Sequence, residues 1–165
     1  MRGDVEVRPT DGGGLGLFAR RAFSPGELMF RRTNTLVGSR ADVAALPSAE
    51  RAHVCQVDAD RFALVAAPGC YANHSCDPCA VRHGVAVLAL RRVEPGDEIT
   101  LDYRVHALDG DTWPCECGTA ACTGVVEGSF FALPADRQAL LLPHAPAFIR
   151  REHRRRARAG PSRRT

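Results

Sequence analysis

Short apolar runs interrupted by glycine and proline fill the first two thirds of the chain. Seven of these runs have the composition of short strands: residues 5–8, 15–19, 27–31, 62–66, 80–82, 85–90 and 98–103. Pro25-Gly26 and Pro95-Gly96 each precede an acidic residue and a run of strand formers, as tight turns that enter strands do. The pattern predicts a mainly β domain.

Helical signal is weaker and lies mostly at the C-terminal end. Residues 41–54 predict one short helix that is interrupted near Pro47. Two further helices are predicted over residues 135–142 and 147–158, on either side of a break that contains two prolines. The arginine-rich residues 154–165 are expected to form a frayed or disordered tail.

Length and hydropathy limit the architecture and the location of the protein. A chain of 165 residues, 45% of them hydrophobic, suffices for one compact domain with short appendages. No apolar run reaches the roughly 18 residues of a membrane span, and the N-terminus lacks the apolar stretch of a signal peptide. We therefore expect a soluble monomer without a membrane partner, cytoplasmic, or nuclear if the source is eukaryotic.

Charge is divided unevenly along the chain. All 22 basic residues are arginine. Residues 1–149 hold 14 arginines against 18 acids, a net charge of about −4, whereas residues 150–165 hold eight arginines against one acid, about +7. An acidic body suits a cationic substrate, and a basic tail suits a weak contact with nucleic acid through phosphates. A simpler interpretation accounts for the same pattern: both charged regions are solvated surface, and the C-terminal end of a helix favours cationic residues.

Cysteine is concentrated in one short segment. Of the seven cysteines, Cys115, Cys117 and Cys122 lie within eight residues. In a reducing compartment such crowding indicates metal binding rather than a disulfide framework. Three thiolates are one short of the four that a closed tetrahedral structural zinc site needs.

Three further motifs have ordinary interpretations when each is taken alone. A glycine run, Gly12-Gly13-Gly14 with Gly16, leads into an apolar strand and is usually a flexible turn. The polar stretch 71–78 (Tyr-Ala-Asn-His-Ser-Cys-Asp-Pro) is typical of an Asx-rich loop. Residues 93–103 form a turn and a strand that ends in a tyrosine, as many core strands do.

Taken together and in this order, the four motifs resemble the SET domain family of protein-lysine methyltransferases over roughly residues 3–128. The resemblance implies a mainly β, β-clip-like SET fold with several small curved sheets, short helices and a C-terminal helical extension. It also implies a pseudoknot, in which the segment after Tyr103 threads beneath the loop that holds Asn73 and His74. The implied divisions are a SET domain over 3–108, a post-SET zinc-binding segment over 109–128, the helical extension over 129–158 and a disordered tail over 159–165.

The resemblance assigns roles to individual residues. S-adenosylmethionine would be bound by the backbone of Gly13, Gly14, Leu15 and Gly16 and, from the other side, by Asn73 and His74. Trp113 would stack on the adenine, although a core or surface tryptophan is an equal alternative. Tyr103 falls at the position of the catalytic tyrosine, beside both the cofactor and the lysine channel, and Tyr71 is a weaker candidate for that channel. Cys76 would join Cys115, Cys117 and Cys122 as the fourth ligand of a structural zinc ion.

The implied reaction is methyl transfer to a lysine amine of a basic protein substrate by in-line displacement at the sulfonium. Three positions depart from the usual family pattern: Cys79 replaces an asparagine, Cys70 an arginine and Leu101 an aromatic residue. Two alternatives of other classes stay open. One is a catalytically silent SET-like binding module, and the other is a zinc-containing nucleic-acid-binding protein.

Overall fold

Ten short strands and eight short helical elements build the part of the protein that the structure, a computed structural model, describes: residues 3–108 and 110–159. The strands are β1 (Val5–Pro9), β2 (Leu15–Ala19), β3 (Leu28–Arg31), β4 (Asn34–Gly38), β5 (Val54–Asp58), β6 (Arg61–Val65), β7 (Ala80–His83), β8 (Ala86–Ala89), β9 (Thr112–Pro114) and β10 (Val125–Glu127). The α-helices are α1 (Arg40–Ala44), α2 (Ser48–Arg51), α3 (Ala135–Leu141) and α4 (Ala147–Ala159). Four 3₁₀ turns are η1 (Gly69–Tyr71), η2 (Tyr103–His106), η3 (Phe130–Ala132) and η4 (Leu142–His144).

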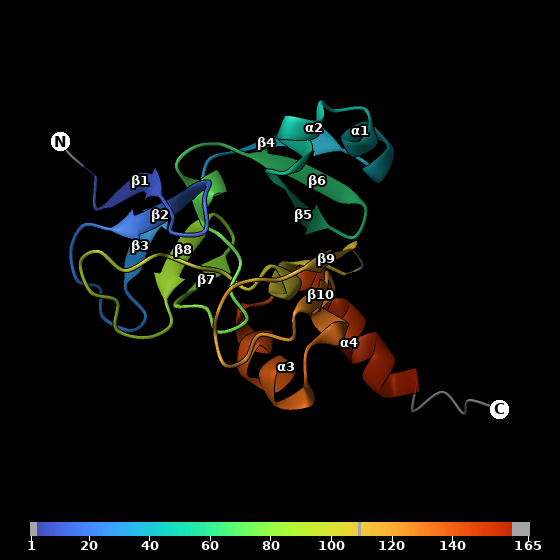
Figure 1. Cartoon of the computed structure of the whole chain (residues 1–165). Coiled ribbons are helices and arrows are strands. Elements are labelled where there is room, and N and C mark those ends of the chain that lie inside the picture. Colours follow the sequence, from blue (N-terminus) through green and yellow to red (C-terminus); the bar gives the residue numbers. More distant parts are fainter. Residues whose placement is uncertain (1–2, 109, 160–165) are drawn as a thin grey trace.

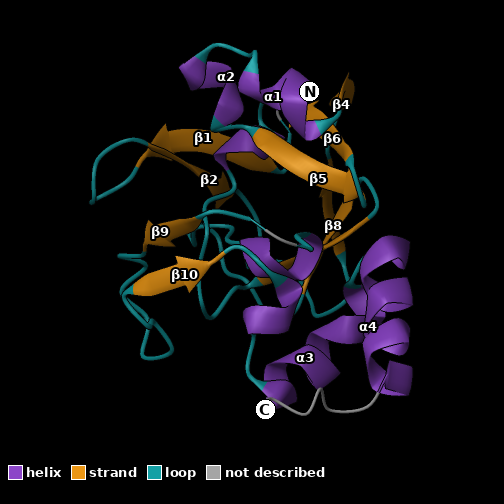
Figure 2. Cartoon of the chain, turned by 90° about the vertical axis from the view of Figure 1, so that its right-hand side faces the viewer, coloured by secondary structure: helices purple, strands orange, loops and turns teal. Residues whose placement is uncertain are grey.

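All strand pairs are antiparallel and form four small sheets, β1-β2, β3-β8-β7, β4-β6-β5 and β9-β10. The sheet β4-β6-β5 with α1 and α2 lies at one end of the molecule, and α3 and α4 lie at the other (Figures 1 and 2). This arrangement confirms the predicted mainly β fold of several small sheets with short helices.

The predicted strand over residues 98–103 is not a continuous strand. Only two isolated bridges involve it, one between Phe18 and Glu98 and one between His74 and Leu101. The segment then turns at Asp102, whose carboxylate accepts a hydrogen bond from the Arg104 backbone N–H at the start of η2. Because its two ends pair with different partners, the segment connects two parts of the molecule instead of extending one sheet.

Local sequence explains where the helices differ from the prediction. Residues 41–54 contain two helices, since Ser39 and Asp42 form a capping box for α1 while Pro47 precedes the first turn of α2. Helix α4 continues to Ala159, so the first residues of the expected frayed tail are helical. Residues 160–165, the rest of that tail, lie outside the described residues. No helix within 3–108 or 110–159 is long and apolar enough to cross a membrane.

Strands β4, β5, β9 and β10 were not predicted from the sequence. Strand β4 begins with the polar pair Asn34-Thr35, and β9 and β10 have only three residues each. Segments this short carry too few side chains for an alternating pattern to be recognised. Pairing with neighbouring strands, rather than local composition, makes them strands.

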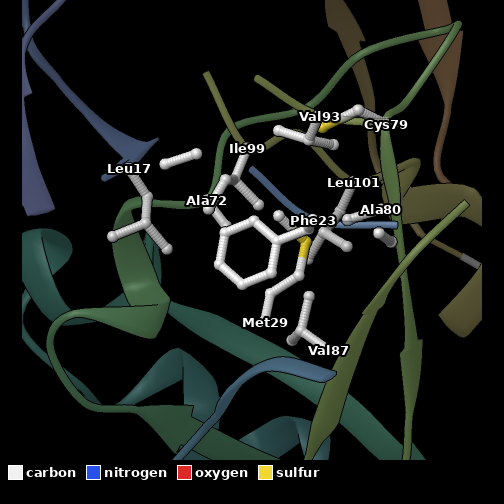
Figure 3. Packing of buried hydrophobic residues seen from close by; sticks show 12 residues of the cluster. Leu17, Phe23, Met29, Ala72, Cys79, Ala80, Val87, Val93, Ile99 and Leu101 are labelled. Carbon is white, nitrogen blue, oxygen red and sulfur yellow. The ribbon is translucent and has the colours of Figure 1, made fainter. Parts of the chain in front are cut away.

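The larger core lies between the β1-β2 hairpin and the β3-β8-β7 sheet. Phe23 occupies its centre, surrounded by Leu17, Met29 and Val87, and Ile99 enters it from the connecting segment (Figure 3). Each of these side chains is at most 3% exposed. This burial holds residues 98–101 against both sheets.

A second core joins the C-terminal helices to the body of the protein. Leu141 of α3 and Ile149 of α4 are fully buried with Val105 of η2 and Phe130 of η3. Since η2 begins at Tyr103, the helical extension supports the backbone directly after the predicted catalytic tyrosine.

Backbone hydrogen bonds join the loop at Asn73 to the connecting segment. The Leu101 N–H donates to the Asn73 carbonyl (2.9 Å), and the Ser75 N–H donates to the Leu101 carbonyl (3.0 Å). This is the pairing that the predicted pseudoknot requires, while the threading of the chain beneath the loop stays a prediction.

We predict that Ile149→Ala destabilises the protein by about 2–5 kcal/mol, because it leaves a cavity in the second core. Leu140→Ala is the matched control, since Leu140 lies on α3 and is 60% exposed, and should change stability by less than about 0.5 kcal/mol. Denaturant unfolding of both variants measures the difference. Equal losses would contradict the assignment of α4 to the core.

Candidate functional site

The predicted site residues His74, Tyr103 and Trp113 form one aromatic cluster. The Tyr103 backbone N–H donates to His74 Nδ1 (3.3 Å). The ring centroids of His74 lie 5.4 Å from Tyr103 and 6.0 Å from Trp113. Burial lowers the pKa of His74 below its usual value, although Asp102 opposes this shift. A neutral imidazole whose Nδ1 accepts a hydrogen bond fits these surroundings.

Two members of this cluster, His74 and Trp113, line a cavity of about 980 Å³, whereas Tyr103 does not. One wall is the segment 8–12 with Phe18, another is the loop 73–75, and the third is Trp113 with the cysteine-containing segment 114–117. The volume is at the upper end of the range for small-molecule sites. The cavity therefore brings segments from three distant parts of the chain to one place where a ligand can bind.

Acidic side chains outnumber basic ones on the cavity wall. Four carboxylates line it, those of Asp11, Asp77, Glu98 and Glu116, against two guanidinium groups, those of Arg8 and Arg91. Arg91 is paired with Asp77 (3.6 Å), so the remaining lining has an excess of negative charge. Such a wall favours a cationic ligand or substrate.

The glycine run forms the turn between β1 and β2. Gly13 and Gly14 both have φ of +83°, which residues with a side chain rarely adopt. Gly16 is required for a different reason, because a Cβ there would lie 2.6 Å from Glu98 Oε1 and 2.7 Å from Thr10 Cγ2. Thr10 and Gly12 line the cavity, whereas the predicted cofactor-binding residues Gly13, Gly14, Leu15 and Gly16 do not.

Asn73 connects the glycine turn to Glu98. Its Nδ2 donates to the Leu15 carbonyl (3.0 Å) and to Glu98 Oε1 (2.8 Å). Glu98 was not predicted from the sequence as a site residue. The signal for Glu98 was the alternation of apolar and polar residues along this segment. Ile99 and Leu101 are buried in the core, whereas Glu98 and Thr100 line the cavity.

The Tyr103 hydroxyl is fixed by the chain itself. It donates to the Ala72 carbonyl (2.9 Å). Burial raises the pKa of Tyr103 to about 12, and the charges of Glu98 and Cys70 add to the shift. The phenol is therefore neutral at physiological pH and acts as a hydrogen-bonding group rather than as a base. Tyr71 contacts His53 and the larger core and does not line the cavity.

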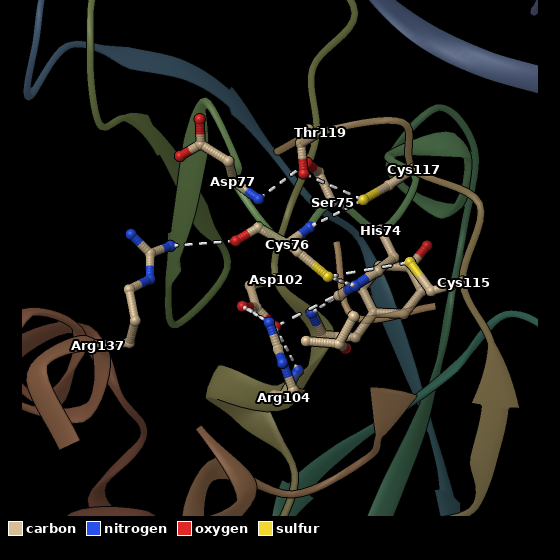
Figure 4. Close-up of polar contacts among 12 residues, drawn as sticks. His74, Ser75, Cys76, Asp77, Asp102, Arg104, Cys115, Cys117, Thr119 and Arg137 are labelled. Atoms are coloured by element: carbon tan, nitrogen blue, oxygen red, sulfur yellow. Dashed lines mark hydrogen bonds and ion pairs between the residues drawn. The ribbon is translucent and has the colours of Figure 1, made fainter. Parts of the chain in front are cut away.

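The four cysteines proposed as metal ligands come together on one side of the cavity. Their sulfur atoms all lie within 4.8 Å of one another. Cys76 comes from the loop after His74, and its Sγ is 3.9 Å from that of Cys115 (Figure 4). Zn–S bonds of about 2.3 Å in a tetrahedron separate the sulfurs by about 3.8 Å. The group could thus hold one thiophilic metal ion, and its role as a zinc site stays a prediction.

The protonation of the thiols agrees with a metal site. Burial opposes ionisation of Cys117, but hydrogen bonds from the Cys76 N–H and from Thr119 lower its pKa to about 6. Burial raises the pKa of Cys115 to about 12. One thiol therefore ionises readily, and a metal ion would have to displace the proton from its neighbour.

A buried ion pair lies between the cysteines and the segment at Tyr103. Arg104 donates to both oxygens of Asp102 (2.9 and 2.8 Å), and Asp102 is 2% exposed (Figure 4). Burial lowers the pKa of Arg104, but Asp102 and, to a smaller extent, Cys76 and Cys115 raise it by more, so the net shift is upward. The guanidinium is thus close enough to Cys76 and Cys115 to interact with them electrostatically.

The remaining cysteines lie outside this group. Cys79 is 4% exposed and packs in the larger core, where its Sγ donates to the Glu98 carbonyl (3.3 Å). Cys55 lies on β5 and Cys70 in η1, and both are half-buried. These positions agree with ordinary buried or semi-buried thiols.

Several arginines of the basic tail already have partners. Arg155 and Arg156 both pair with Glu152, and Arg151 pairs with Asp58 (3.0 Å). Arg156 also lies over the Phe131 ring, 3.7 Å from its centroid. Arg163 and Arg164 lie outside the described residues. The described part of the tail therefore behaves as a charged helix face, as the simpler of the two interpretations expects.

A comparison with protein-family models identifies the chain. The SET domain model matches residues 14–104, more than half of the sequence. The chain belongs to the SET domain family. The match includes Asn73, His74 and Tyr103, and it ends before the segment that holds Trp113 and the last three cysteines.

Relatives and solved structures agree with this assignment. The SET domain protein is 35% identical over 68 residues to a histone-lysine N-methyltransferase, H3 lysine-36 specific, of Emericella nidulans, covering 36% of the chain and 7% of that protein. It is 24% identical over 140 residues to the protein of the same name from Yarrowia lipolytica, covering 75% and 18%. A structure of KRYPTONITE in complex with mCHG DNA and SAH shares the fold, with a TM-score of 0.57 at 19% identity over 76% of the chain and 29% of that protein.

The chain spans only a small fraction of the length of these curated relatives. Likeness to the solved structure at this identity supports the fold alone. What this protein catalyses must therefore be argued from its own residues.

We predict that the purified protein holds about one thiophilic metal ion per chain. Replacing any one ligand, as in Cys76→Ser, should reduce the metal content several-fold because a closed four-ligand site loses a bond. Cys55→Ser is the control, since Cys55 lies outside the group, and should retain the ion. Elemental analysis of protein prepared without added metal decides, and a metal-free, folded wild-type protein would contradict the prediction.

Proposed function

We propose that this SET domain protein is an S-adenosylmethionine-dependent protein-lysine N-methyltransferase. The supporting observation is the direct contact of Tyr103 with His74, which lines a cavity of cofactor size. Both residues fall within the matched family region, and relatives of the chain are named as lysine methyltransferases.

The cavity fits the cofactor in size and charge. S-adenosylmethionine supplies an electrophilic methyl group on a positively charged sulfonium. The excess of carboxylates on the wall favours this cation, and Trp113 offers an aromatic face. Asn73 holds Glu98 and the β1-β2 turn in place, so the binding wall is organised before a ligand arrives.

The residues around Tyr103 would orient the lysine amine rather than attack anything themselves. The amine must lose its proton before transfer, and burial next to a sulfonium lowers its pKa through desolvation and like charge. The Tyr103 hydroxyl, held on the Ala72 carbonyl, is neutral and can position the amine. The contribution of the protein is thus mainly proximity and the exclusion of water.

A structural zinc ion held by Cys76, Cys115, Cys117 and Cys122 would fasten the segment 113–117 over the cavity. Cys76 lies two residues after His74, and Trp113 lies two residues before Cys115. Binding of the ion therefore couples the order of the aromatic cluster to that of the cysteines.

The substrate is a lysine of another protein. This sequence contains no lysine, so methyl incorporation into lysine cannot come from the chain modifying itself. The acidic cavity wall and the names of the relatives favour a basic protein, with histone H3 as the first candidate. If histones are the substrates, the protein acts in the nucleus rather than the cytoplasm.

We predict transfer of labelled methyl groups from S-adenosylmethionine to lysine in basic proteins, tested with histones and with a whole lysate. Tyr103→Phe removes only the hydroxyl and should lower kcat at least about 100-fold, with cofactor affinity nearly unchanged. Mass spectrometry locates the modified residue. A folded Tyr103→Phe protein with wild-type turnover would show that the wrong tyrosine or reaction was chosen, and cofactor binding without any transfer would favour the silent binding module.

We predict that Gly16→Ala weakens S-adenosylmethionine binding about tenfold or more, since the new Cβ must displace Glu98 from Asn73. Gly3→Ala is the control, because a Cβ there meets only the Val5 carbonyl oxygen at 3.9 Å and Gly3 does not line the cavity. Calorimetric titration of both variants measures the affinities. If the two substitutions have equal effects, the close approach at Gly16 does not shape the binding wall.

A further inference from the structure

A second cavity, of about 470 Å³, shares no lining residue with the first. The sheet β4-β6-β5, the turn between β7 and β8, and the start of α4 enclose it. Its polar lining comes from Arg32, Arg82, Arg150, His83, His144 and Asn34. The turn residues Gly84 and Val85 and the helix residue Ala147 are exposed, so the cavity is open to solvent.

Two of its arginines are buried without an acidic partner. Arg32 is 8% exposed and Arg82 is 5% exposed. Within the described residues, no carboxylate pairs with either guanidinium, and no aspartate or glutamate lines the cavity. Arg82 donates to the Gln56 carbonyl (3.2 Å), Arg32 donates to the Cys55 sulfur (3.6 Å), and Arg32 Nε is buried without a hydrogen-bond partner.

The buried Arg82 retains its charge. Burial lowers the pKa of Arg82 to about 10, with the Cys55 sulfur opposing the shift and the charge of Arg32 adding to it. Arg82 is therefore still protonated at physiological pH. Two like charges removed from water are costly unless an anion compensates them. His106, beside Arg82, is kept neutral because burial and the two arginines lower its pKa well below the usual value.

Helix α4 adds a favourable electric field. It has 13 residues, and its first turn contains no acidic residue. Ala147, at its start, lines the cavity, and Arg150 one turn later lies there with its Nη1 bound to the Ala145 carbonyl. Free backbone N–H groups and the positive end of the helix dipole attract anions.

From the buried arginines and the helix start together, we propose that this cavity binds a phosphate-class oxyanion. Guanidinium forks match the tetrahedral oxygens of phosphate, and three of them converge here. Asn34 Oδ1, a buried acceptor without a partner, can accept a hydrogen bond from the hydroxyl of hydrogen phosphate. The source is either free phosphate or a phosphate of a bound nucleic acid.

The test compares sodium phosphate with sodium chloride at equal pH and ionic strength on the full, metal-loaded chain. Phosphate should raise the thermal unfolding midpoint with a logarithmic dependence on its concentration c, as RT ln(1 + c/Kd), from which an apparent Kd follows. Arg150→Gln should weaken that Kd about tenfold. Arg151→Gln is the matched control, because Arg151 is on the same helix, pairs with Asp58 and does not line the cavity, and should change it less than about twofold.

Arg82→Lys gives a second measurement that keeps the charge and removes the fork, and it should also weaken the phosphate Kd. Binding of a short DNA duplex to the same variants separates the two sources. A larger loss with Arg150→Gln than with Arg151→Gln assigns the site to nucleic-acid phosphate, whereas equal losses with the phosphate effect retained assign it to free phosphate. Equal midpoints in phosphate and chloride, or equal effects of both variants on the phosphate Kd, would overturn the proposal.

Discussion

The pairing of the Asn73 loop with the segment at Leu101 is the interaction on which the rest of the site depends. Two backbone hydrogen bonds and one side-chain acceptor, His74 Nδ1, hold these segments together. Residues next to these hydrogen bonds contact three different parts of the molecule. Asn73 reaches the β1-β2 turn, Cys76 reaches the other cysteines, and Tyr103 turns back to the Ala72 carbonyl. A shift of one residue in this pairing would separate all three groups.

Charge is arranged differently at the two cavities. The larger cavity has more carboxylates than guanidinium groups, as suits a cationic cofactor and an approaching lysine. The smaller cavity gathers arginines and a helix start and has no acidic lining residue among those described. Asp102 and Arg104 lie between the pairing segment and the cysteines as a neutral, buried pair. The acidic body expected from composition is thus an average over two surfaces of opposite character.

The chemistry proposed for the larger cavity makes modest demands on acid and base groups. Tyr103 is too weak an acid to ionise, and His74 is held in its neutral form by burial. Both groups contribute fixed hydrogen-bonding positions instead. Positioning of this kind needs a rigid support, which η2 obtains from the second core and the cysteine segment would obtain from a metal ion.

Much of this protein follows from local sequence alone. The short apolar runs indicated a mainly β fold, and the order of four motifs indicated the family, because both signals lie within stretches of a few residues. Cys115, Cys117 and Cys122 indicated a metal site for the same reason, and resemblance to the family indicated Cys76 as the fourth ligand. Only the tertiary structure determined the features that depend on contacts between segments far apart in the sequence. The bridge of residues 98–103 to two partners, the place of Glu98 on the cavity wall, and the meeting of Arg32, Arg82 and Arg150 are set by long-range packing and burial. Local periodicity carries no information about these long-range contacts, because each of these residues lies in a segment whose local sequence pattern is that of an ordinary strand or surface.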